Sequence, residues 1–294
     1  MRKNFWAAIA LVLVAAAWGA TFVLMKPAID SQPFYDFLAT RFTLAVIVMI
    51  IVRPKVLRDF NPGLLVRGVP IGALLGLGYV TQTIALEMTT AAITGFLTGL
   101  YVVMTPVLAW IFLRQRVGKK VFWGIALATV GLALISINFE NFGVEVGQIW
   151  GIICAVLFAA HIVALGVFSP KLDAYALTVV QLATCAVICW VGALPDGYQA
   201  PQNGDVWFAI IFSAVFATAI AFLVQTWAQS HMDSSRVAII LTSEVVFAAA
   251  ISVAVGQETL SLQVLIGGVV LIAAMLIVEW PTRNSPPVLV EALH

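Results

Sequence analysis

Polar side chains recur at helical spacing inside a strongly apolar stretch of this chain. Thr94, Thr98, Tyr101 and Thr105 follow one another at intervals that place them on one side of a helix. In hydrocarbon, an unpartnered polar group costs several kcal/mol. We therefore expect these side chains to face the protein interior, where they can hydrogen-bond a neighbouring helix or a small polar solute.

Two further apolar stretches carry polar faces of the same kind. Their members are Tyr79, Gln82 and Thr83 in one stretch, and Thr218, Phe222, Gln225 and Gln229 in the other. Hydrogen bonds between helices would explain any one of these faces. Three of them together favour a hydrated path through the protein.

Trp18 and His161 also interrupt apolar stretches. The other tryptophans fall near the ends of such stretches, where amphipathic rings meet lipid headgroups, but Trp18 is seven residues from the nearest end. We expect Trp18 to face a central cavity, with lipid contact or helix packing as the alternative. His161 lies at the mirrored depth. It either bonds a neighbouring helix or contacts a solute, with proton transfer as a third role.

Arg41 and Glu244 are charged residues within apolar stretches. At a rise of 1.5 Å per residue across about 30 Å of hydrocarbon, their depths agree within about 7 Å. They either form an ion pair that joins two parts of the chain or bind the carboxylate and ammonium groups of a solute. Glu244 is the stronger candidate, because the long Arg41 side chain can also extend toward the membrane surface.

The sequence contains no recognisable catalytic or metal-binding pattern. The histidines are scattered, the zinc motif HExxH is absent, and Ser234 and Ser235 have no base in a familiar arrangement. Cys185 and Cys189 share a helix face but have no histidine or carboxylate nearby in sequence. We therefore predict no enzyme activity, no catalytic residue, no metal site and no cofactor.

Composition indicates which elements must position these residues. The chain has 294 residues, of which 62% are hydrophobic and 10% charged, whereas a soluble globule carries about 25% charged residues. A membrane-spanning helix needs about 20 apolar residues. This length predicts an all-α integral membrane protein with ten transmembrane helices, at residues 6–25, 34–52, 68–86, 92–113, 121–138, 147–168, 175–194, 206–230, 235–256 and 260–280.

Basic residues predict the orientation. With a cytoplasmic N-terminus, all of the 15 Lys and Arg residues except Lys26 and Arg41 fall on the cytoplasmic side. The even number of spans returns the C-terminus to the cytoplasm. We therefore expect a multi-pass protein of the plasma membrane, which is the inner membrane in a bacterium.

The chain also repeats itself at an offset of 143 residues. The matching pairs are Pro27 and Pro170, Asp30 and Asp173, Gln82 and Gln225, Thr83 and Thr226, and Gly124 and Gly267. Each half then holds five spans, an odd number, so the second half enters the membrane in the opposite orientation. We predict a first repeat over 1–143, an inverted second repeat over 144–281 and a cytoplasmic tail over 282–294. Inverted repeats are typical of secondary transporters, with the substrate bound near the midplane.

Three segments carry a family resemblance: AAAWGATFVLMKPA, LTGLYVVMTPVLAWIFL and LTSEVVFAAAISVAVGQETLSLQVLIGGVVLI. They resemble the EamA-type family of the drug/metabolite transporter superfamily, including bacterial exporters of amino acids and aromatic amino acids. The resemblance covers nearly the whole chain and implies a ten-helix exporter of small metabolites. The first half departs from the family, because it has LRQRV where a glycine–glutamate pair is usual; the second half has GQETL.

These observations predict a secondary transporter that exports small amphipathic metabolites, above all amino acids, by alternating access around a midplane cavity. Export of another metabolite or a drug is the alternative, and an intramembrane enzyme or a channel agrees less well. The predicted partners are the small-molecule substrate and the lipid bilayer, without nucleic acid, for a monomer or weak oligomer. The predicted substrate-binding residues are Trp18, Tyr79, Gln82, Thr98, Tyr101, His161, Gln225 and Glu244, with Arg41 and Glu244 as an ion pair or coupling pair.

Overall fold

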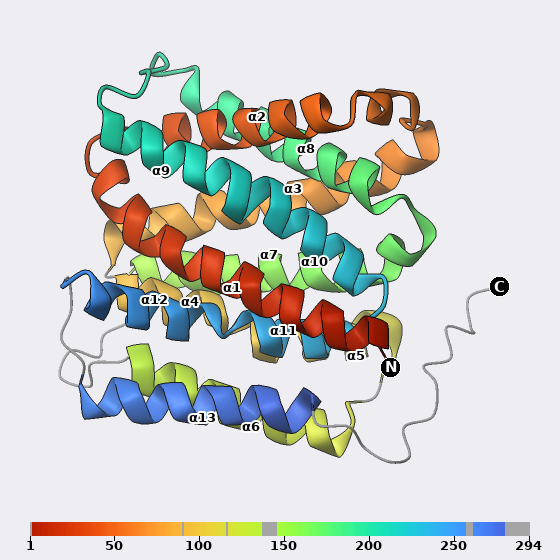
Figure 1. Ribbon diagram of the computed structural model, residues 1–294, viewed down its shortest axis with the longest axis vertical. Helices are drawn as coiled ribbons and strands as arrows, with labels where there is room; N and C mark the ends of the chain where they lie inside the picture. The colour runs from red at the N-terminus through yellow and green to blue at the C-terminus, as the bar shows by residue number, and fades with distance from the viewer. Residues whose placement is uncertain (1, 90, 116, 137–145, 257–260, 280–294) are drawn as a thin grey trace.

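Long apolar helices dominate the computed structural model, which describes residues 2–89, 91–115, 117–136, 146–256 and 261–279 (Figure 1). The first half contains α1 (Arg2–Ile29), α2 (Phe34–Val52), the 3-10 helix η1 (Pro54–Arg58), α3 (Pro62–Met88), α4 (Ala91–Gly99), α5 (Tyr101–Leu113) and α6 (Lys119–Ser136). The second half contains α7 (Val146–Phe168), the 3-10 helix η2 (Ser169–Lys171), α8 (Ala174–Ala193), α9 (Gly204–Ala214), the π-helix η3 (Val215–Ile220), α10 (Ala221–Gln229), α11 (Ser234–Leu241), α12 (Glu244–Ala254) and α13 (Leu262–Glu279). The described residues include no strand.

Eight helical stretches in the described part of the chain are long and apolar enough to cross a membrane. They coincide with eight of the ten predicted spans. The predicted fifth and tenth spans, 121–138 and 260–280, overlap α6 and α13, which are not among these eight stretches; the apolar part of α13, Leu262–Val278, is shorter than any of them. Ten membrane crossings stay a prediction. The predicted tail at 282–294 and the predicted repeat boundary at 143 lie outside the described residues.

The two halves contain corresponding helices, and the offset of 143 residues is kept at particular helix bounds. The bounds of α6 and α13 differ by 143 residues at both ends. The same offset relates two interrupted helices: Leu100 separates α4 from α5, and Thr242 and Ser243 separate α11 from α12. The chain reverses direction from one long segment to the next (Figure 1). The first half contains five such segments: α1, α2, α3, α4 with α5, and α6. Because five is an odd number, the second half begins in the opposite direction from the first.

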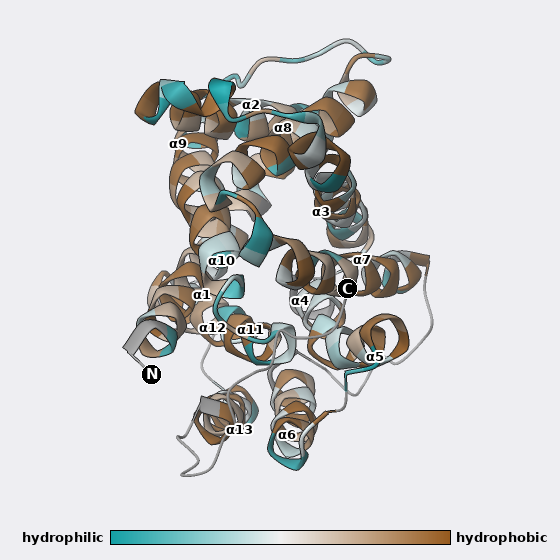
Figure 2. Cartoon of the chain, turned by 90° about the vertical axis from the view of Figure 1, so that its right-hand side faces the viewer, coloured by the Kyte–Doolittle hydropathy of each residue, from teal (hydrophilic) through white to brown (hydrophobic). Residues whose placement is uncertain are grey.

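The helices of the two halves are interleaved. α1 packs mainly against α12, α3 against α7 and α8, α2 against α8, and α6 against α13. In the view along the helices, α6 and α13 lie together at one edge of the molecule (Figure 2). The same view shows that hydrophobic residues predominate in the helices. Glycine permits one of the closest crossings, since a Cβ built on Gly19 would lie 2.7 Å from the carbonyl oxygen of Glu244.

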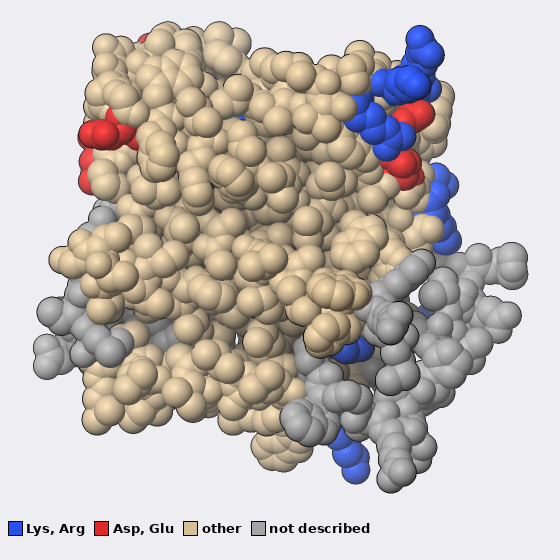
Figure 3. All heavy atoms as spheres, viewed as in Figure 1, with Lys and Arg blue, Asp and Glu red and all other residues tan. Residues whose placement is uncertain are grey.

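Charged side chains mark the helix ends. On the face drawn in Figure 3, Lys and Arg gather mainly at one end of the helices, beside the turn from α2 to α3 that carries Arg53, Lys55 and Arg58. Arg53 joins this turn to the second half, because it pairs with Asp59 at 2.9 Å and with Asp173 at 3.2 Å. Such clustering of basic residues is what the positive-inside rule describes. The side of the membrane stays a prediction.

Candidate functional site

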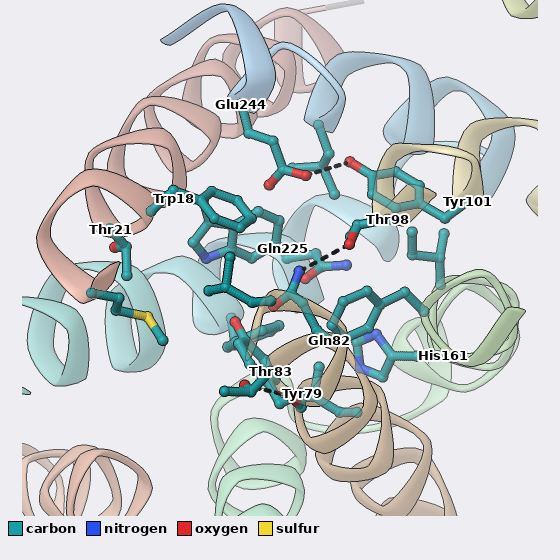
Figure 4. A pocket seen from close by; sticks show the side chains of 18 of the residues that line it. Trp18, Thr21, Tyr79, Gln82, Thr83, Thr98, Tyr101, His161, Gln225 and Glu244 are labelled. Atoms are coloured by element: carbon teal, nitrogen blue, oxygen red, sulfur yellow. Dashed lines mark hydrogen bonds between the residues drawn. The ribbon is translucent and has the colours of Figure 1, made fainter. Parts of the chain in front are cut away.

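A cavity lies between the two halves, and its space, including the part open to solvent, is about 720 Å³. α1 to α5 form one part of its wall, and α7, α10, α11 and α12 form the other. Figure 4 shows how side chains from these helices converge on it. The cavity brings together every predicted site residue: Trp18, Arg41, Tyr79, Gln82, Thr98, Tyr101, His161, Gln225 and Glu244. Their role in substrate binding stays a prediction.

The wall of the cavity repeats the 143-residue offset. Five pairs of lining residues obey it: Trp18 and His161, Tyr79 and Phe222, Gln82 and Gln225, Thr98 and Leu241, and Tyr101 and Glu244. The last pair is in contact, because the Tyr101 hydroxyl donates to Oε1 of Glu244 at 3.4 Å (Figure 4). Equivalent residues of two inverted copies can touch only beside the axis that relates the copies. The cavity therefore lies on this axis.

Tyr101 and Glu244 each begin the second part of an interrupted helix, Tyr101 in α5 and Glu244 in α12. At each break an N–H group donates to a carbonyl three residues back, Val103 to Leu100 at 2.9 Å and Val245 to Thr242 at 3.2 Å, which is the tighter 3-10 pattern. Thr242 and Ser243 stabilise the break before α12 by donating hydrogen bonds to carbonyls one turn earlier. Paired breaks of this kind in two inverted repeats are the usual surroundings of a substrate site in secondary transporters.

Arg41 does not pair with Glu244, which corrects the predicted ion pair. The Arg41 side chain is 1% exposed and is turned inward, so it does not extend to the membrane surface. Its Nε donates to Oγ1 of Thr218 at 2.7 Å and its Nη2 to the carbonyl oxygen of Ala217 at 3.4 Å, while Nη1 donates to Sδ of Met25 at 3.2 Å. Both polar acceptors belong to η3, whose π-helical turn departs from the regular α-helical hydrogen-bond ladder.

Trp18 reaches the same carbonyl. Its Nε1 donates to the Ala217 oxygen at 2.8 Å, so this acceptor in η3 receives hydrogen bonds from both Trp18 and Arg41. The ring of Trp18 lies 5.4 Å from that of Phe222, and Phe222 lies 6.1 Å from Tyr79, between ring centroids. One wall of the cavity is therefore aromatic. Such a wall can bind an apolar group or present ring faces to a cation.

His161 is buried, and its Nε2 lies 2.8 Å from Oε1 of Gln181 in α8. This is the bond to a neighbouring helix that was one of its predicted roles. No pattern in the sequence identifies Gln181 as the partner. The ring of His161 also lines the cavity, 6.2 Å from the ring of Phe222.

Gln225 carries a polar atom without a partner. Its Nε2 donates to Oε1 of Gln229 at 3.1 Å, and Gln229 donates onward to the carbonyl oxygen of Ile162 at 2.6 Å. Oε1 of Gln225 is buried and has no hydrogen-bond partner among the described residues. An unsatisfied buried acceptor costs about 1–3 kcal/mol. This oxygen can therefore accept a hydrogen bond from a donor that enters the cavity. Gln82 differs, because its Nε2 already donates to Oγ1 of Thr98 at 3.3 Å.

Several lining residues were absent from the predicted site, among them the aromatic Phe22, Phe158 and Phe222. The repeat offset was a usable signal for one of them, since Phe222 is the counterpart of Tyr79. The same offset relates Tyr101 to Glu244. Phe22 and Phe158 have no such signal, because their counterparts at the repeat offset, Leu165 and Ala15, are not among the lining residues.

The sequence comparisons agree with this duplicated architecture. The model of the EamA-like transporter family matches residues 5–137 and matches again at residues 145–280. The chain belongs to the EamA-like transporter family. The two matches, one in each half, establish the two-repeat fold of this EamA-like transporter.

Relatives of this EamA-like transporter support the same assignment. An uncharacterized transporter of Archaeoglobus fulgidus is 32% identical over 279 residues, which are 94% of this chain and 87% of the relative. The pseudopaline exporter CntI of Pseudomonas aeruginosa is 22% identical over 267 residues, 90% of this chain and 92% of the relative. A solved crystal structure has the same fold, with a TM-score of 0.80 at 16% identity over 93% of this chain and 96% of that one. The chain is thus a multi-pass membrane protein of a family of transporters rather than enzymes.

Proposed function

We propose that this EamA-like transporter exports small amphipathic metabolites that carry a primary ammonium group, above all amino acids with apolar or aromatic side chains. The observation that carries this proposal is the cavity on the repeat axis, which combines Glu244, the unpartnered Oε1 of Gln225 and an aromatic wall. An ammonium group has three donors and no acceptor, so it complements these two acceptors. The aromatic wall suits the apolar remainder of the substrate.

Transport proceeds by alternating access around this midplane site. The substrate is held by the polar and aromatic residues of the cavity while the two repeats rock to open it to one side and then to the other. The proposal includes ten membrane crossings, cytoplasmic termini, repeats over 1–143 and 144–281 with a tail over 282–294, and a plasma-membrane location. In a bacterium this is the inner membrane. The transporter acts as a monomer or weak oligomer.

Export rather than uptake is supported by the relative named as a pseudopaline exporter. The name of that relative also defines the second candidate, which is export of a larger metabolite by the same fold. The bonding of Arg41 supports a substrate of low net charge. Arg41 carries the guanidinium group of the described cavity lining, and acceptors of η3 already take two of its hydrogen bonds, so it is not free to bind an anionic group.

The test is counterflow of radiolabelled L-phenylalanine in proteoliposomes, at equal pH on both sides. We expect saturable exchange that phenethylamine inhibits, because it keeps the ammonium group, whereas 3-phenylpropionate, which keeps only the carboxylate, inhibits it less. Gln225→Leu should raise the half-saturating concentration about tenfold or more, the equivalent of one hydrogen bond to a charged group. Gln202→Leu is the matched control, since Gln202 is exposed in the loop before α9.

Flux that never saturates, or that is unchanged in both Trp18→Ala and Gln225→Leu, would contradict the proposed function. Stronger inhibition by 3-phenylpropionate than by phenethylamine would contradict the assigned role of the ammonium group.

A further inference from the structure

The contact between Tyr101 and Glu244 has a consequence for alternating access. When two inverted repeats exchange conformations, the result is equivalent to a half-turn of the molecule about their axis, and the two sides of the membrane change places. A residue beside the axis keeps its depth during this exchange, while the open path to it changes side. Glu244 touches its own repeat counterpart and therefore occupies such a position.

One other pair of repeat counterparts in the cavity, Tyr79 and Phe222, is in ring contact, but neither residue is acidic. Trp18 and His161 are repeat counterparts too, but each is hydrogen-bonded to a different partner: Trp18 to the carbonyl oxygen of Ala217 and His161 to Gln181. They exchange environments when the repeats exchange conformations. Glu244 is the acidic side chain of the described cavity lining. Because it lies beside the axis, the open path from either side of the membrane reaches it at the same depth.

Glu244 is also a buried carboxyl group without a cationic partner. Its side chain is part of a residue that is 5% exposed, and its hydrogen bond comes from the neutral Tyr101 hydroxyl. Among the described residues it forms no ion pair. An uncompensated buried charge costs several kcal/mol, and this cost disappears when the group binds either a proton or a cation.

The groups around Glu244 do not supply that compensation. The titratable and charged side chains near it or in the same cavity are Tyr101 on α5, Tyr79 on α3, Cys154 and His161 on α7, and Arg41 on α2. α1 and α4 contribute uncharged side chains to the cavity wall, and α6 and α13 contribute none. Arg41, the permanent cation of this set, donates to η3 and Met25 instead.

We propose that Glu244 is a proton-binding site at which a proton and the ammonium group of the substrate take turns, so that export of one substrate molecule is exchanged for entry of one proton. This proposal rests on the proposed function. Substrate that enters from the cytoplasm displaces the proton from the carboxyl group to that side. After the substrate leaves on the far side, the carboxyl group takes up a proton there and returns with it. For a zwitterionic substrate each cycle moves one positive charge inward.

The first test separates coupling from exchange in proteoliposomes loaded at acidic pH and diluted into alkaline buffer. Wild-type protein should accumulate radiolabelled L-phenylalanine transiently above its equilibrium level, because protons leave as substrate enters. Glu244→Gln should lose this overshoot yet still catalyse counterflow at equal pH, with a half-saturating concentration raised about tenfold by the weaker ammonium contact.

Three results would overturn the proposal while leaving the proposed function in place. One is wild-type counterflow without an overshoot. Another is an overshoot that persists in Glu244→Gln. The third is loss of the overshoot in His161→Gln with counterflow retained, which would move the proton site to His161. Absence of wild-type counterflow, by contrast, would refute the proposed function for this substrate.

A second test needs no substrate. Infrared difference spectra of the purified full-length protein, taken between low and high pH, should contain C=O stretching bands from its protonated carboxyl groups, and Glu244→Gln should lack the component that comes from Glu244. Asp36→Asn is the matched control, because Asp36 is buried outside the cavity and accepts a hydrogen bond from the backbone N–H of Gln199 at 2.9 Å. If the spectra of wild type and Glu244→Gln are the same, Glu244 binds no titrating proton and the proposal is wrong.

Discussion

Gly19 allows α1 and α12 to cross at backbone contact beside the cavity, and this crossing can be tested by adding one methyl group. A Cβ at position 19 would lie 2.7 Å from the backbone nitrogen of Ala248, 2.7 Å from the carbonyl oxygen of Glu244 and 2.8 Å from Cβ of Phe247. Ordinary contacts begin at 3.4 Å. Because neither backbone atom can rotate away, Gly19→Ala requires the two helices to separate by about 0.7 Å, which is 3.4 Å minus 2.7 Å.

We expect Gly19→Ala to lower the free energy of unfolding by about 1–3 kcal/mol, the usual cost of overpacking. The higher helix propensity of Ala offsets up to about 1 kcal/mol of this loss. Gly95→Ala in α4 is the matched control, because a Cβ there would have nothing within 4 Å and so gains the propensity term alone. Unfolding by sodium dodecyl sulfate in mixed micelles, followed by circular dichroism, measures both variants. The displacement of Glu244 should also lower the counterflow rate of Gly19→Ala.

Equal stability and equal counterflow of Gly19→Ala and Gly95→Ala would refute this reasoning. They would mean that α1 and α12 do not approach each other closely at Gly19. They would also mean that the position of Glu244 in the cavity does not depend on that approach.

Three further substitutions test separate features. Trp18→Phe keeps an aromatic ring but removes the donor to Ala217, so the free energy of unfolding should fall by about 1 kcal/mol; unchanged stability in the same micellar titration would contradict the hydrogen bond. Asp36→Ala removes the acceptor of the Gln199 N–H and should speed amide exchange at that position, and an unaltered exchange rate would count against the contact. Arg114 has a φ of 53° at the end of α5, so Arg114→Gly should raise the thermal midpoint through a gain of up to about 1 kcal/mol; a lower midpoint would show that this conformation is not strained.

Hydropathy and helix-stopping residues predicted most of the helical framework. The predicted span 34–52 coincides with α2, because Pro33 precedes it and Pro54 follows it closely. Local sequence could not predict the interruption between α11 and α12, since Thr242 and Ser243 are compatible with a continuous helix and no proline or glycine adjoins them. The π-helix η3 likewise has no recognisable sequence signature. Both features depend on tertiary contacts.

The candidate site was predictable in its members but not in their partners. Polar side chains inside apolar helices must turn away from lipid, so Gln82, Gln225 and Tyr101 converge on one cavity. Depth alone suggested that Arg41 meets Glu244. Depth does not specify the direction in which a side chain leaves its helix, and Arg41 in fact reaches η3. The offset between Tyr101 and Glu244 was visible in the sequence, but an offset alone does not show that two residues touch.

The interleaving of the two halves constrains how the protein is made. α1, α2 and α3 find their main packing partners in α12, α8 and α7, so the segments that leave the ribosome first lack most of their contacts until the last ones are inserted. Arg41 then lies in the bilayer before Thr218 and Ala217 have been synthesised. An arginine at the centre of a membrane helix costs about 2.5–3.5 kcal/mol during insertion. The first half should consequently remain a substrate for membrane quality-control proteases until the second half emerges, and two half-chains made separately should protect each other from degradation only when they are produced together.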